Sequence, residues 1–113
     1  MNMSKNLNAY IISAKVSIEV DVKNGRENAK DIASNRFSEK IRGDFSISDV
    51  SCKDKSVASL DTFVVTSKSF FDITAHDEQK AISILKSRCE EKGLILIEDS
   101  ITIEDEEPGV DVI

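Results

Sequence analysis

The sequence predicts an α+β fold in which two β-α-β halves share one four-stranded antiparallel sheet. Two long stretches, 10–22 and 63–75, carry apolar residues at alternate positions, which is typical of strands with one buried face. Each is followed by apolar residues at helical spacing, then by a glycine and a second strand pattern. The 113 residues suit one small domain.

The first half is the clearer of the two. After the strand at 10–22, Asn24 is a candidate N-cap, and Gly43 stands where a helix C-terminus is expected. Apolar spacing predicts a helix over 25–42, with a buried side formed by Ala29, Ile32, Ala33, Phe37 and Ile41. A second strand is predicted over 45–52. Its apolar alternation shifts between Ile47 and Val50, which predicts a bulge there.

The second half repeats this plan. The strand at 63–75 leads to a helix capped by His76 or Asp77, and Gly93 follows the helix. A last strand is predicted to end at residue 104. The expected domain is 9–104, with halves at 9–53 and 62–104, a flexible N-terminus at 1–8 and an acidic C-terminal tail at 105–113.

The two halves align with each other along most of their length. Tyr10 matches Phe63, and Lys15 matches Lys68. Any two β-α-β units share much of this pattern, so both internal duplication and chance remain open. Right-handed crossovers then interleave the halves into a ferredoxin-like β-α-β-β-α-β sheet with both helices on one face. The other face is mostly polar, which fits either a monomer or a homodimer.

Charge is distributed unevenly along the chain. The net charge is −6, yet all 15 lysines and arginines lie at or before Lys92. After that point every charged residue is acidic. These are the candidate partner-binding residues: Glu98, Asp99, Glu104, Asp105, Glu106, Glu107 and Asp111. They either keep the protein in solution or meet a basic partner, for which a nucleic-acid-processing enzyme is the candidate. Direct nucleic-acid binding is not expected.

Motifs for catalysis or metal binding are missing from the sequence. There is no CxxC pair, phosphate-binding loop or nucleophile elbow, so we expect no enzyme, no cofactor and no metal site. Asp49 and Asp99 occupy matching places in the two halves. Two bulges or strand ends that turn them to water explain them more simply than a pair that acts in acid–base catalysis or binds a cation. No apolar run of transmembrane length or secretory leader stands out, and the two distant cysteines suit reduced thiols. We therefore expect a cytoplasmic protein without membrane contact.

The alternating strand at 16–22, followed by 24–33, resembles small proteins encoded by bacteriophages and mobile elements. The Asn-x-x-Glu-Asn-Ala-Lys-Asp-Ile-Ala segment carries this resemblance, and 69–75 with 77–85 repeats it loosely. Some proteins of that kind are anti-CRISPR or other anti-defence proteins. The resemblance implies an inhibitor acting in a bacterial host, and it transfers no functional residue.

These observations favour a non-catalytic inhibitor or adaptor whose acidic C-terminal surface engages a basic protein. An alternative is a regulatory dimer that senses a small ligand through the loop at Asn24, Gly25 and Arg26. A third is a structural or assembly subunit.

Overall fold

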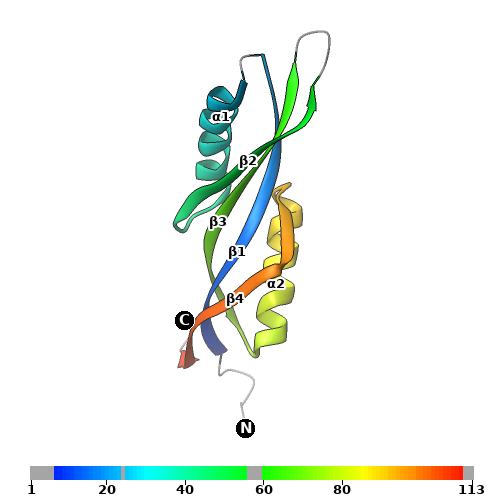
Figure 1. The fold of residues 1–113 in the computed structure, drawn as a ribbon. Helices are drawn as coiled ribbons and strands as arrows, with labels where there is room; N and C mark the ends of the chain where they lie inside the picture. Colours follow the sequence, from blue (N-terminus) through cyan, green and yellow to red (C-terminus); the bar gives the residue numbers. More distant parts are fainter. Residues whose placement is uncertain (1–6, 24, 56–59, 111–113) are drawn as a thin grey trace.

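The computed structural model describes residues 7–23, 25–55 and 60–110. The elements follow the order β1 (Leu7–Val22), α1 (Gly25–Lys40), β2 (Phe45–Lys55), β3 (Asp61–Ala75), α2 (Glu78–Glu91) and β4 (Ile95–Val110) (Figure 1). The strands form one antiparallel sheet in the order β2-β3-β1-β4. This confirms the predicted ferredoxin-like topology, with β1 and β3 in the centre and β2 and β4 at the edges.

The core lies between the sheet and the helices. Every even-numbered residue of β1 from Tyr10 to Val22 is buried, because alternate side chains of a strand point to the same face. Each helix contributes three buried residues at four-residue spacing: Ala29, Ala33 and Phe37 from α1, and Ala81, Leu85 and Cys89 from α2. The opposite side of the sheet carries the odd-numbered residues of β1 and the even-numbered residues of β3, and we call it the open face.

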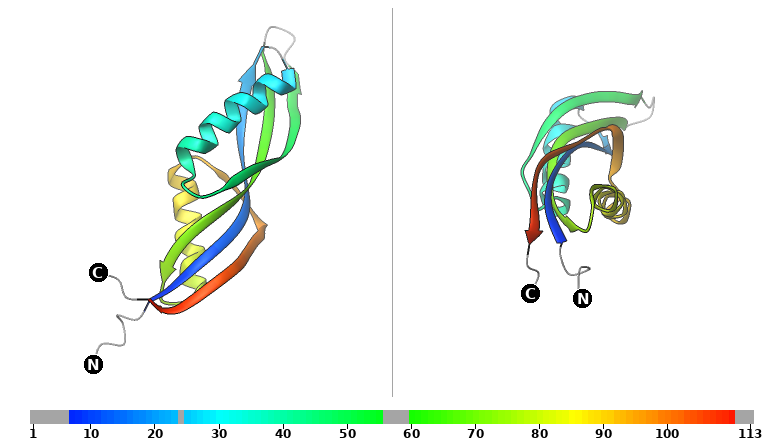
Figure 2. Two further views of the ribbon diagram at one scale, coloured as in Figure 1. Left: turned by 90° about the vertical axis from the view of Figure 1, so that its left-hand side faces the viewer. Right: turned by 90° about the horizontal axis from the view of Figure 1, so that it is seen from below.

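The molecule is long and narrow, with extents of 65 × 20 × 18 Å. The helices do not lie side by side. α1 covers one end of the sheet and α2 the other, with their C-terminal ends meeting near the middle, and the strands curl around both (Figure 2). Lys40 at the end of α1 donates a hydrogen bond from Nζ to the carbonyl oxygen of Lys92, the C-cap of α2, at 2.6 Å.

The two halves are related by a local two-fold axis. β1 pairs with β3 in a register that sets Lys15 directly opposite Lys68, the residues that also match when the halves are aligned. When a residue of one half pairs with its own counterpart in the other half, the axis that relates the two halves must lie between them. The axis therefore passes between these two lysines.

Side-chain contacts obey the same symmetry. Arg36 of α1 donates from Nη1 to the carbonyl oxygen of Glu19 at 3.5 Å, and Arg88 of α2 donates from Nη1 to that of Asp72 at 3.1 Å. Glu19 follows Lys15 at the same sequence distance as Asp72 follows Lys68. Each helix is thus tied to its own strand at an equivalent point.

The prediction of a loose acidic tail from residue 105 needs correction. β4 continues to Val110, with Asp105 paired to Ile11 and Glu106 paired to Tyr10. The reason is that β1 begins at Leu7, so its first residues have backbone groups that need partners. Pro108 is tolerated because β4 is an edge strand. Residues 111–113 lie outside the described part of the chain.

The other boundaries shift by smaller amounts. α1 ends at Lys40, two residues before the predicted end. Gly43 lies where its missing Cβ matters, since a Cβ there would overlap the carbonyl oxygen of Phe70. The predicted connection at 53–61 is shorter, because β2 runs to Lys55 and β3 begins at Asp61. Asn24 and residues 1–6 and 56–59 lie outside the described residues.

Candidate protein-binding surface

The acidic residues of the C-terminal half gather on one edge of the sheet. All the side chains of this group are exposed, and we call it the acidic edge: Glu98, Asp99, Glu104, Asp105, Glu106 and Glu107. β4 is paired only with β1, so its outer side faces away from the sheet. Asp111, the seventh predicted residue, lies outside the described part of the chain.

A large bulge sets the position of Glu98 and Asp99. Lys15 pairs with Ile97, while Ser13, two residues earlier, pairs with Thr102, so β4 has three extra residues here. The Ser100 hydroxyl fills the gap in the ladder. It accepts the backbone N–H of Lys15 at 2.7 Å and donates to the carbonyl oxygen of Ile97 at 2.5 Å.

This bulge has a counterpart in the first half. The β2–β3 register shifts between Ile47 and Asp49, and Asp49 is exposed, as Asp99 is. The prediction that two bulges turn these aspartates to water is confirmed.

A second irregularity in β4 lies at Glu104. Ile103 pairs with Ile12 and Asp105 pairs with Ile11, so Glu104 is an extra residue between them. Its Oε2 accepts a hydrogen bond from the Ser13 hydroxyl at 2.5 Å. The four consecutive carboxylates at 104–107 are all exposed, because neither face of this segment of β4 is covered.

Little positive charge lies close enough to neutralise the acidic edge. Glu98 pairs with Lys86 of α2 at 2.9 Å, but both side chains are about half exposed or more, and such pairs are weak. Within the described part of the chain, Asp99 and residues 104–107 make no ion pair. Among the described residues, Glu98 is therefore the one member of the acidic edge with an ion-pair partner.

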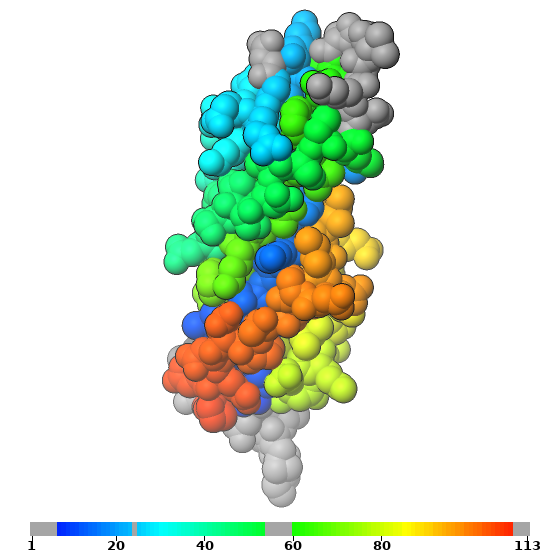
Figure 3. All heavy atoms as spheres, in the orientation of Figure 1, coloured from blue at the N-terminus to red at the C-terminus, as the bar shows by residue number. Residues whose placement is uncertain are grey.

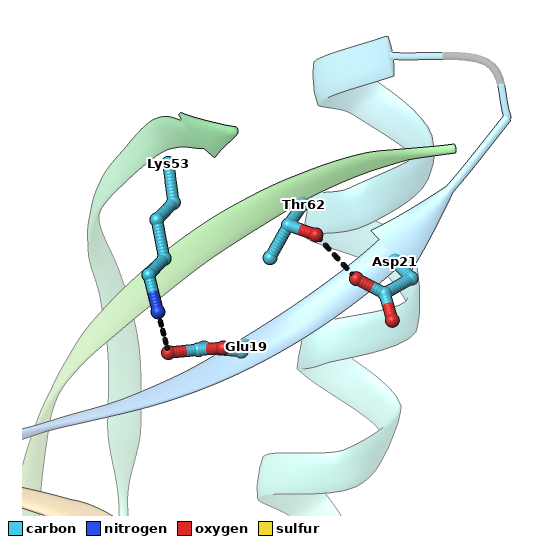
Figure 4. Close-up of polar contacts among 4 residues, drawn as sticks. All are labelled: Glu19, Asp21, Lys53 and Thr62. Carbon is cyan, nitrogen blue, oxygen red and sulfur yellow. Dashed lines mark hydrogen bonds and ion pairs between the residues drawn. The ribbon is translucent and has the colours of Figure 1, made fainter. Parts of the chain in front are cut away.

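In the first half, carboxylates of the open face have side-chain partners. On the open face, Lys53 of β2 pairs with Glu19 of β1 at 2.7 Å, and the Thr62 hydroxyl donates to Oδ1 of Asp21 at 2.6 Å (Figure 4). The edge strand of this half supplies a cation, while the edge strand of the other half supplies acids. The fold is symmetric, but its charge is not.

Next to the acidic edge, the open face is hollowed. Figure 3 shows the depression between the green atoms of β2 and the orange atoms of β4, where blue atoms of β1 are visible. A shallow groove of about 450 Å³ lies here, and its charged lining residues are Lys15, Lys68, Asp99 and Glu104. The sequence did not reveal this groove, because it depends on which strands become neighbours.

The second predicted site gains no supporting geometry. Gly25 has φ of +80° at the start of α1, and Arg26 is exposed. Neither lines the groove or the larger cleft of about 530 Å³. Asn24 lies outside the described residues. The larger cleft lies where the two helix C-termini meet, and its basic lining residues, Lys40, Arg42, Arg88 and Lys92, suit the negative ends of the helix dipoles.

The contacts and burial of the remaining candidate residues belong to the fold. Asp77 caps α2 by accepting the Lys80 N–H at 2.7 Å, and the His76 carbonyl oxygen accepts from Asn8. Cys52 is exposed and Cys89 is buried, and burial raises the pKa of the Cys89 thiol. Among the described residues there is no group of three side chains suited to hold a metal ion, and no helix long and apolar enough to cross a membrane.

Comparison with known proteins gives no match to a family, to a curated protein or to a solved structure.

Proposed function

We propose that this protein is a non-catalytic inhibitor or adaptor that binds a basic partner protein through the acidic edge. The observation that carries the proposal is the arrangement of six exposed carboxylates on one paired strand, of which only Glu98 has an ion-pair partner. Opposite charge on a partner would speed association and select against acidic competitors.

An ordered strand is better suited to this role than a tail. A tail must lose conformational freedom when it binds, and that loss weakens the complex. Pairing with β1 holds residues 104–107 in place before any partner arrives. Binding energy is then not spent on ordering the carboxylates.

The concentration of carboxylates favours a partner that normally holds nucleic acid. Proteins that bind nucleic acid meet its phosphates with Lys and Arg, and the four consecutive acids at 104–107 present the same sign of charge as phosphates. We infer that the partner is a nucleic-acid enzyme whose basic groove receives β4, as the resemblance to phage anti-defence proteins also implies.

The test is affinity capture from bacterial lysate with the full-length protein and a neutralised variant, E104Q/D105N/E106Q/E107Q. Substitution preserves side-chain size, whereas deletion would remove part of β4. The matched control, D31N/E39Q/E90Q/E91Q, removes the same charge from exposed helix positions.

We expect a basic protein that is captured by the wild type and the control, lost from the neutralised variant, and released by high salt. Equal capture by all three proteins, or a wild type that captures no basic protein, would show the proposal to be wrong.

A further inference from the structure

The centre of the open face carries two lysines that form no ion pair within the described residues. Lys15 and Lys68 lie directly opposite each other, an arrangement that destabilises a sheet. Both are exposed, and neither makes an ion pair with another described residue. The Lys68 ammonium lies 5.7 Å from the centroid of the Phe70 ring.

A carboxylate on the same strand as Lys68 also forms no ion pair within the described residues. Asp72 of β3 is exposed on the open face, and it borders the larger cleft, where Arg88 bonds to its backbone carbonyl and not to its carboxylate. Its symmetry equivalent, Glu19, pairs with Lys53. Across the sheet from Asp72, the register places Ile11 on β1 and then Asp105 on β4. The edge strand therefore adds a second acid here instead of a cation.

These charges form a self-complementary pattern along β3. Lys68, Phe70 and Asp72 alternate along the strand, so all three belong to the open face. Read forward, the order is cation, aromatic ring, anion, and read backward it is the reverse. Two copies of this strand laid antiparallel, face to face, would therefore match each charge with its opposite.

We propose that a second copy of this chain packs on the open face, with a two-fold axis across the strands at Phe70. Lys68 of each copy then pairs with Asp72 of the other, and the two Phe70 rings meet at the axis. On the neighbouring strand, Ile11 of each copy lies against the aliphatic stem of the other copy's Lys15.

The face has the size and composition that such an interface needs. A standard interface buries about 800 Å² on each partner, and the sheet side of a molecule 65 Å long and 20 Å wide offers more than this. Ile11 of β1 and Ile97 of the neighbouring strand β4 are both 38% exposed and add apolar surface to this face. Ser17 and Thr66, hydrogen-bonded to each other at 2.8 Å, leave no unpartnered hydroxyl to bury. This inference does not depend on the proposed function.

The experiment is sedimentation equilibrium of the full-length protein and four variants over a range of concentrations. The variants are K68E, D72K, the exchange K68E/D72K, and the control D31K, which makes the same charge change as D72K at an exposed position of α1, on the other side of the sheet. Circular dichroism melts verify that each variant is folded. If a reversal prevents folding, K68Q and D72N take its place.

We expect a dimer for the wild type and for D31K, with dissociation constants at least about tenfold higher for K68E and for D72K. The exchange variant should recover most of the lost affinity, because each charge again meets its opposite. A monomeric wild type, single variants that associate like the wild type, or an exchange variant as weak as the single variants would each overturn the proposal.

Discussion

Serine hydroxyl groups provide hydrogen-bond partners where irregular backbone pairing or burial would otherwise leave a polar group without one. Ser100 replaces a missing ladder partner for Lys15, and the buried hydroxyls of Ser67 and Ser69 bond to each other at 2.6 Å. Among the described residues, every buried side-chain nitrogen or oxygen has a hydrogen-bond partner. A buried polar group without a hydrogen-bond partner destabilises the folded state. These serines therefore stabilise the strands at the positions where they lie.

Ser100→Ala tests this at the bulge in β4. The substitution removes the acceptor for the Lys15 N–H and the donor to the Ile97 carbonyl. We expect the free energy of unfolding in urea to fall by about 1 kcal/mol. Ser46→Ala, at an exposed position of β2, is the control and should change little. Equal stability of the two variants would mean that Ser100 does not hold the bulge.

At the scale of elements, the sequence patterns predicted the features that depend on residues close together in the chain. Alternation identified β1 and β3, and the apolar spacing identified both helices. The shift in alternation near Ile47 and the positions of Asp49 and Asp99 indicated the two bulges.

The end of β4 and most of the candidate site were not predictable in this way. Residues 104–109 have no apolar alternation, because both faces of this segment are exposed. They form a strand because the first residues of β1, distant in sequence, offer them backbone partners. The acidic composition was visible from the sequence, but its presentation on an ordered edge was not.

Deleting residues 104–113 therefore has a structural consequence. It removes the partner of Leu7–Ile11 and with it the neighbour of Tyr10, which is buried in the intact chain. We expect the free energy of unfolding to fall by about 2 kcal/mol or more, the scale for exposing one large apolar side chain. A chain that ends at Val110 is the control. A stability equal to that of the full-length protein would mean that this segment is not part of the sheet.

At the scale of the whole molecule, the long shape follows from the local two-fold symmetry. The axis between Lys15 and Lys68 places the C-terminal ends of both helices at the middle of the sheet. The negative ends of two helix dipoles meet there, and Lys40 and Arg88 near those ends offset them. The same axis on the open face sets two lysines opposite each other, which no local pattern in the sequence indicates.

The central claim is that the acidic residues are held on an ordered strand beside β1, and one nuclear magnetic resonance measurement tests it most directly. In a nuclear Overhauser spectrum of the isotope-labelled full-length protein, we expect cross-strand contacts between backbone protons of Ile11 and Asp105 and of Tyr10 and Glu106. Strand-type chemical shifts should extend through residue 107. Missing contacts and random-coil shifts from Glu104 onward would contradict the account, because the acidic residues would then belong to a tail.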